Sequence, residues 1–192
     1  MKKIILLLML SFPAVIYAQN FQVGVKGGMN ASNFTGGDLD TKALIGFHVG
    51  GILSFGLGDY FALQPEVLFS SQGARYDMAG EKENLTLSYI NVPVMLKFKT
   101  TSGFYVEAGP QVGFKVGEDA NVPGQTIENF AKNLDLSVGA GLGFQGASGL
   151  GIGARYMAGL SKVGDFDAST TDPNFRNSVI QVSLFYTLFN NR

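Results

Sequence analysis

Apolar and polar residues alternate with a period of two along most of the chain. Within residues 104–116 the even positions are apolar or proline, from Phe104 to Val116, whereas the odd positions are mostly polar or small, among them Glu107 and Lys115. Such alternation is typical of a β-strand with one apolar face. It recurs along the chain and predicts eight strands, at residues 21–32, 45–55, 61–72, 85–99, 104–116, 134–145, 150–161 and 180–189.

The connections between these strands alternate between short and long. Short turns are expected at 56–60, 100–103 and 146–149, and longer polar connections at 35–42, 73–84, 117–132 and 162–176. This order places all the short turns at one end. Outer-membrane barrels have short periplasmic turns and longer external loops. We therefore predict an all-β fold, an eight-stranded antiparallel up-and-down transmembrane β-barrel with both termini at the periplasmic end.

Phenylalanines lie on the apolar faces beside the short turns and near the first strand's start. Aromatic girdles occur where a barrel wall meets the lipid headgroups. We therefore expect a periplasmic aromatic girdle in contact with outer-membrane lipids, formed by Phe21, Phe55, Phe61, Phe98, Phe104 and Phe144.

The second face of the strands carries glycines and balanced charges. An eight-stranded barrel is just wide enough for side chains to fill its interior, and charges facing lipid cost several kcal/mol each. We therefore predict a filled lumen with an ion-pair network of Lys26, Glu66, Lys97, Glu107, Lys115, Asp135 and Arg155. In the alternative, a soluble lipocalin-like binder, these charges would lie on a solvated outer face.

Two features fit the strand pattern poorly. Pro65, Pro93 and Pro110 lie within predicted strands, where each removes a ladder hydrogen bond. The alternation also slips near Tyr89 and Ile90, because the apolar positions change from odd to even. A β-bulge at that point would reconcile the two halves.

The first residues predict export. Lys2 and Lys3 precede an apolar stretch at 4–10, and Tyr17-Ala18-Gln19 forms a cleavage site. This is the pattern of a signal peptide at 1–18, with the barrel domain at 19–192, and the apolar stretch is too short for a membrane-spanning helix. The expected location is the outer membrane of a Gram-negative bacterium.

Composition excludes several classes of function. The 14 basic and 15 acidic residues become 12 and 15 once the signal's two lysines are removed, a formal charge of −3 that gives no electrostatic case for nucleic acid. The absence of cysteine excludes disulfides and thiolate chemistry. Glycine, at 26 of 192 residues, is about twice its usual share, which suggests bends or close backbone approach within the sheet.

Candidate chemistry is sparse. His48 is the single histidine, and a Ser-His-acid arrangement with Ser54 or Ser70 and Glu66 is conceivable, as in an outer-membrane hydrolase. We instead expect His48 to be a hydrogen-bonded interior residue and the protein not to be an enzyme. The pairs Asp38 with Asp40 and Asp165 with Asp167 offer oxygen ligands, but such pairs are usually solvated, so we predict no metal and no cofactor.

Five short motifs carry a family resemblance. They are GVKGGMN at 24–30, LQPEVL at 63–68, INVPVMLK at 90–97, EAGPQ at 107–111 and GARY at 153–156. In this order they resemble the PorT-like family of small outer-membrane β-barrel proteins (outer membrane protein beta-barrel domain). The resemblance implies the fold, the location and tolerance of the strand prolines, and it implies no functional site.

These patterns predict a structural or interaction component of the cell envelope. One namesake of the resembled family belongs to a protein-secretion machinery, so envelope or secretion-complex proteins are expected partners, contacted through the external segments 117–132 and 162–176. The alternative functions are a narrow channel or a transport- or secretion-associated barrel.

Overall fold

The computed structural model describes residues 21–35, 41–78, 81–120, 133–161 and 176–190, which form eight strands. The strands are β1 (Phe21–Thr35), β2 (Thr41–Leu57), β3 (Phe61–Met78), β4 (Glu81–Lys99), β5 (Phe104–Ala120), β6 (Leu134–Gln145), β7 (Leu150–Gly159) and β8 (Arg176–Asn190). Among these residues, no helix is long and apolar enough to cross a bilayer. The predicted signal peptide, 1–18, lies outside the described residues.

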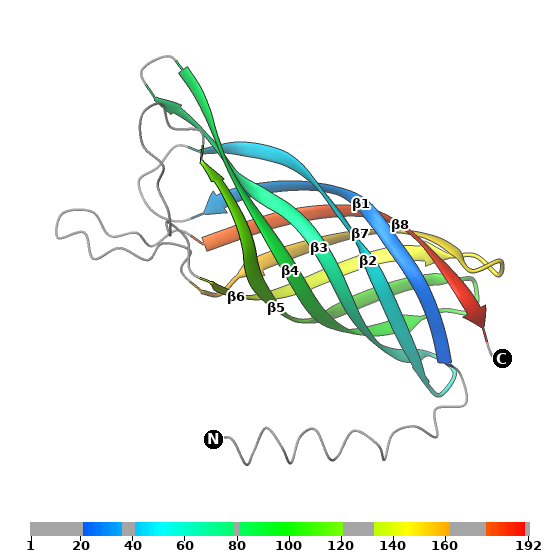
Figure 1. Cartoon of the computed structure of the whole chain (residues 1–192). Coiled ribbons are helices and arrows are strands. Elements are labelled where there is room, and N and C mark those ends of the chain that lie inside the picture. The colour runs from blue at the N-terminus through cyan, green and yellow to red at the C-terminus, as the bar shows by residue number, and fades with distance from the viewer. Residues whose placement is uncertain (1–20, 36–40, 79–80, 121–132, 162–175, 191–192) are drawn as a thin grey trace, which may run out of the picture.

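The strands close into a single barrel. Each strand pairs with its neighbours in the chain, β1 pairs with β8, and all pairings are antiparallel. The short β2–β3, β4–β5 and β6–β7 turns lie at one end, where β8 ends and β1 begins (Figure 1). The predicted eight-stranded antiparallel up-and-down barrel is confirmed.

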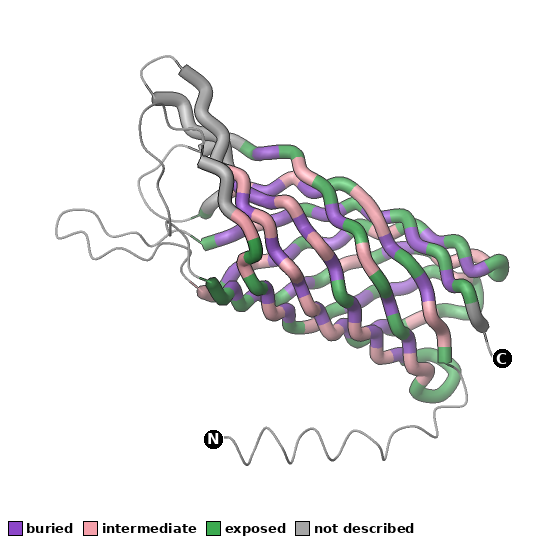
Figure 2. The backbone as a smooth tube through the Cα atoms, in the orientation of Figure 1, coloured by how far each residue is buried: buried purple, intermediate pink, exposed green. Residues whose placement is uncertain are grey.

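Alternation places apolar side chains outside and polar ones inside. On β6, Leu134, Leu136 and Val138 are exposed, whereas Asp135 and Ser137 are buried, and the same alternation recurs around the barrel (Figure 2). From Leu134 to Phe144 the apolar row spans about 25 Å along the barrel axis, at about 3.3 Å per residue and a tilt near 40°, the height of a lipid-facing band. In a lipocalin-like binder the faces would be reversed.

The strands at the external end are longer than expected. β3 continues to Met78 and β4 begins at Glu81, so the predicted connection at 73–84 is mostly a paired hairpin that extends beyond the other strands (Figure 1). Sequence alternation ends earlier because this hairpin is polar, whereas cross-strand pairing continues. β8 likewise begins at Arg176, four residues before the predicted start.

The bulge predicted near Tyr89 and Ile90 corresponds to a register shift in the β4–β5 pairing, but the extra residue lies in β5 and not in β4. β4 keeps one register with β3 through this point, and Leu87 and Tyr89 face inward, fully buried. The apolar residues therefore change faces while the strand continues. The nearby irregularity is in the pairing with β5, where Ser88 lies opposite Gly117 but Tyr89 lies opposite Lys115, so β5 carries the extra residue.

The strand prolines leave the register intact. Near Pro65, Ile52 pairs with Glu66 and Phe55 with Leu63, which is the same register on both sides. Pro93 and Pro110 lie in β4 and β5 without a register shift beside them. Each proline lacks an N–H donor, so its cost here is a local ladder hydrogen bond and not a change of pairing.

Candidate functional site in the barrel lumen

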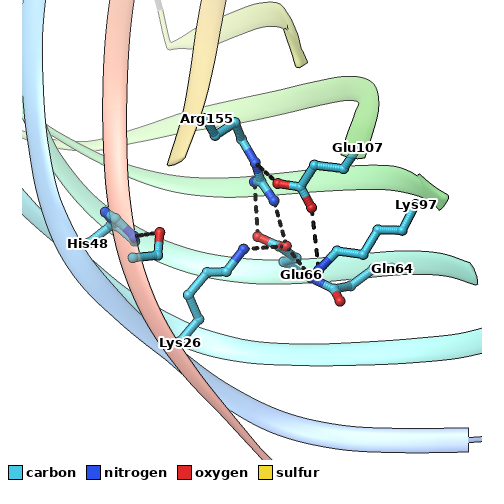
Figure 3. Close-up of polar contacts among 8 residues, drawn as sticks. Lys26, His48, Gln64, Glu66, Lys97, Glu107 and Arg155 are labelled. Atoms are coloured by element: carbon cyan, nitrogen blue, oxygen red, sulfur yellow. Dashed lines mark hydrogen bonds and ion pairs between the residues drawn. The ribbon is translucent and has the colours of Figure 1, made fainter. Parts of the chain in front are cut away.

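Strand register assembles a cluster of charged side chains inside the barrel. Lys97 on β4 pairs with Glu107 on β5, Glu107 pairs with Gly141 on β6, and Gly141 pairs with Arg155 on β7. Because Gly141 has no side chain, Arg155 reaches Glu107 across β6. Lys26 on β1 and Glu66 on β3 approach from the other side of the lumen (Figure 3).

Arg155 is the centre of this cluster. Its Nη2 and Nη1 donate to the two carboxylate oxygens of Glu66 at 2.8 and 3.1 Å, and its Nε donates to Glu107 Oε1 at 2.8 Å. Lys26 Nζ and Gln64 Nε2 each donate to Glu66 Oε1 at 2.7 Å. Charge-assisted and bidentate bonds of this kind are the strongest that side chains form.

Lys97 completes the charge cluster, which we define as Lys26, Glu66, Lys97, Glu107 and Arg155. Its Nζ lies 3.4 Å from Glu107 Oε2, and 4.0 and 5.0 Å from the ring centroids of Tyr105 and Phe185. The ring faces add cation–π attraction to the longer ion pair. All five members are buried, and three cations against two carboxylates leave a formal charge of +1.

An aromatic layer lies on the periplasmic side of the charge cluster. It consists of Ile52, Tyr105 and Phe185, and the two rings meet edge to face with centroids 6.1 Å apart. Glycines opposite the rings make room: a Cβ on Gly151 would lie 2.1 Å from Phe185, and one on Gly143 2.5 Å from the Tyr105 hydroxyl. The alternation alone did not predict this layer, although Tyr105 and Phe185 stand at its inward-facing positions.

His48 belongs to a second polar network. Its Nδ1 lies 2.7 Å from Asn30 Oδ1 and its Nε2 lies 2.8 Å from Ser183 Oγ. The amide oxygen can only accept, so Nδ1 carries the proton and Ser183 donates to Nε2. The order serine, histidine, asparagine resembles a hydrolase triad in which an asparagine replaces the usual carboxylate. All three residues are nevertheless buried inside the lumen, and His48 bonds neither Ser54, Ser70 nor Glu66 in the described structure.

Two predicted members of the network lie elsewhere. Lys115 stands eight residues beyond Glu107 on β5, about 26 Å along the strand and toward the external end. Asp135 is buried, and it accepts a hydrogen bond from Ser161 Oγ at 2.8 Å. The structure therefore brings together five of the seven predicted charges.

The six girdle phenylalanines form three cross-strand pairs at the short-turn end. Phe21 pairs with Phe55, Phe61 with Phe98, and Phe104 with Phe144. The first two pairs also bring their ring centroids to 5.3 Å. Five of the six rings are exposed, and Phe55 is half-buried.

No group of three or more potential metal ligands occurs among residues 21–35, 41–78, 81–120, 133–161 and 176–190. Asp38, Asp40, Asp165 and Asp167 lie outside these ranges.

Family comparison agrees with the barrel geometry. The sequence model of the outer membrane protein beta-barrel domain matches residues 17–165. The chain belongs to this family. As a member of the outer membrane protein beta-barrel domain family, it is a barrel of the Gram-negative outer membrane, and its exposed apolar band faces lipid. No curated protein sequence matches it.

Solved structures resemble this family member in fold. Neisserial surface protein A, from Neisseria, superposes with a TM-score of 0.56 at 16% identity, covering 88% of this chain and 97% of its own. Ail, the attachment invasion locus protein of Yersinia pestis, crystallised with the heparin analogue sucrose octasulfate, gives a TM-score of 0.50 at 16% identity, covering 88% of this chain and 98% of its own. At this identity the likeness concerns the fold.

Proposed function

We propose that this barrel is a closed structural or interaction component of the cell envelope, with a plugged lumen. The observation that carries the proposal is the span of Arg155, which reaches from β7 to Glu66 on β3 while Lys26 from β1 meets the same carboxylate. Side chains from opposite walls thus meet in the middle. The aromatic layer lies against them on the periplasmic side, so a solute would have to displace both.

Conductance in planar bilayers tests the plug. We expect wild-type protein, first checked for folding by its heat-dependent gel mobility, to give no steady openings. The variant Glu66→Ala/Arg155→Ala keeps the cluster charge at +1 but removes the central side chains, so it should conduct. Asp135→Ala, which removes a buried charge outside the cluster, should stay closed. Steady openings of the wild type would contradict the proposal.

A narrow channel is the second candidate, because some buried lumenal polar atoms among the described residues have no hydrogen-bond partner in the protein. Lys97 Nζ, Glu107 Oε2 and Asn91 Nδ2 form no hydrogen bond with another described atom. Buried polar groups of this kind are commonly hydrated. A conducting wild type whose anion preference falls in Lys97→Met would favour the channel.

The resemblance to the PorT-like family supports a finer assignment within these small barrels. Its motifs include all three strand prolines, and a secretion-associated relative favours envelope or secretion-complex proteins as partners through the external segments. We also propose cleavage after Ala18, leaving residues 19–192 as the mature barrel, and the girdle phenylalanines as its periplasmic interface with lipid. N-terminal sequencing of the protein from outer membranes tests the cleavage, since an uncleaved N-terminus would contradict it.

Charge argues against a polysulfated ligand such as the one bound to the Yersinia protein. The segments 35–42, 73–84, 117–132 and 162–176 together hold 11 acidic and six basic residues. This excess of negative charge repels sulfate groups and favours a basic partner. Binding to a heparin column at physiological salt would contradict this part of the proposal. The proposed function includes no catalytic step.

A further inference from the structure

A cavity opens at the short-turn end of the barrel. Its volume is about 290 Å³, at the lower end of the usual range for small-molecule sites. It lies between the β4–β5 turn, the β6–β7 turn and the start of β1, which share one end of the barrel (Figure 1). The residues that line it include Gln22, Lys99, Thr101, Ser102, Gln145 and Gly149. We call this space the periplasmic vestibule.

The vestibule is separate from the charge cluster. Lys99 on β4 pairs with Tyr105 on β5, and Tyr105 belongs to the aromatic layer. The Tyr105 ring in turn lies 4.0 Å from Lys97 Nζ, on the cluster side. A ligand that enters from the periplasm therefore meets Lys99 first and is stopped by the aromatic layer.

Lys99 is a half-buried cation without a counterion in the described structure. No described carboxylate lies within ion-pair distance of its ammonium, whereas Lys26, Lys97 and Arg155 each have one. The described residues that line the vestibule include no aspartate or glutamate. A partly desolvated charge is unfavourable unless it is paired, so this site is suited to an anion.

The neighbouring groups can supply hydrogen bonds to such an anion. Beside Lys99, the Thr101 hydroxyl lines the vestibule, and Gln145 Nε2 has a second N–H besides the one that it donates to Thr187 Oγ1. Thr100 Oγ1 donates to the Phe104 carbonyl oxygen at 2.9 Å and lies 2.9 Å from Ser102 Oγ, so the β4–β5 turn is internally braced. A site of one cation, the Thr101 hydroxyl and an amide N–H, with no described carboxylate, fits the oxygens of a carboxylate or a phosphate.

From this arrangement we infer that the periplasmic vestibule binds an oxyanion, a carboxylate or phosphate group that pairs with the Lys99 ammonium. The group belongs either to a small periplasmic molecule or to the headgroup of an anionic lipid. This inference goes beyond the plugged barrel and is independent of whether the lumen conducts.

Phosphate titration of the folded barrel tests the site. Isotope-labelled protein in phosphatidylcholine nanodiscs is titrated with inorganic phosphate at constant ionic strength, while the backbone amide resonances of Gly103, Gln145 and Gly149 are followed. We expect saturable shifts in wild type and in Lys99→Arg, and a loss of affinity of about tenfold or more in Lys99→Met, since a charged hydrogen bond is lost. Lys115→Met, with the same charge change at the other end, should bind like wild type.

A second set of nanodiscs, containing phosphatidylglycerol, distinguishes the two sources of the anion. If a lipid headgroup is the occupant, the same amides shift before phosphate is added, and Lys99→Met abolishes that shift. If the occupant is a soluble molecule, the lipid leaves these amides unchanged and phosphate still binds. Shifts that never saturate, or that are equal in wild type and Lys99→Met in both kinds of disc, would overturn the inference.

Discussion

Replacing Glu66 by glutamine should strongly destabilise the lumen. The Glu66 carboxylate accepts four hydrogen bonds, from Lys26, Gln64 and twice from Arg155, at 2.7 to 3.1 Å. Glu66→Gln keeps the shape, but it turns one acceptor into a donor and raises the cluster charge from +1 to +2. Breaking a buried ion pair on one side costs about 3–5 kcal/mol, and we expect a loss of that size in the free energy of unfolding.

Glu107→Gln is the matched control, since it makes the same chemical change on β5, two strands away from β3. Glu107 accepts one close bond, from Arg155 Nε at 2.8 Å, and its ion pair with Lys97 is longer, at 3.4 Å. Arg155 also keeps both bonds to Glu66 in this variant. The expected loss is therefore smaller, about 1–3 kcal/mol.

Urea titration in lipid vesicles measures the loss in free energy of unfolding of each variant, provided that the unfolding and refolding curves coincide. Circular dichroism and gel mobility report folding, because the chain has no tryptophan. Lys26→Met added to Glu66→Gln should recover part of the loss, since the cluster charge returns to +1. The reasoning is refuted if Glu107→Gln costs as much as Glu66→Gln, or if both cost less than about 1 kcal/mol, as in a solvated site.

The same titration tests three further changes. Gly151→Ala forces a methyl group against the Phe185 ring and should cost about 1–3 kcal/mol, whereas Gly51→Ala, with open space around it, should be neutral; equal effects would contradict the aromatic layer. Leu142→Arg puts a charge on the lipid-facing band and should cost about 2–4 kcal/mol, and a neutral result would argue against membrane contact. His48→Ala leaves its hydrogen-bond partners unpaired and should cost about 1–3 kcal/mol, with no change in hydrolysis of a chromogenic ester; loss of a wild-type esterase activity would contradict an interior role.

Alternation predicted the barrel because its cause is local. Successive side chains of a strand point to opposite faces. The odd or even position of a residue within its strand was therefore enough to place Lys26, Glu66 and Arg155 inside and Leu142 outside. It failed at Leu87 and Tyr89, because apolar residues were expected only on the lipid face. Near the external end the lumen also buries apolar side chains. There, the odd or even position in the strand predicts which way a side chain faces better than its hydrophobicity does.

The contacts of the charge cluster could be predicted only between strands that a short turn joins. A tight turn fixes the register of its two strands, so the pairs Lys97 with Glu107 and Gly141 with Arg155 follow from the turns at 100–103 and 146–149. The contacts of Glu66 with Lys26 and Arg155 cross the barrel and depend on how the closed sheet is tilted and staggered, which alternation does not encode.

Inward-facing glycines show how the lumen makes room for its large side chains. Large lumenal side chains repeatedly pair with glycine on a neighbouring strand: Lys26 with Gly50, His48 with Gly28, Tyr105 with Gly143, Met157 with Gly139 and Phe185 with Gly151. An eight-stranded barrel is just wide enough for side chains to fill its interior. The glycine excess thus complements a filled interior, and a barrel with an open lumen would not need glycines opposite so many of its large inward side chains.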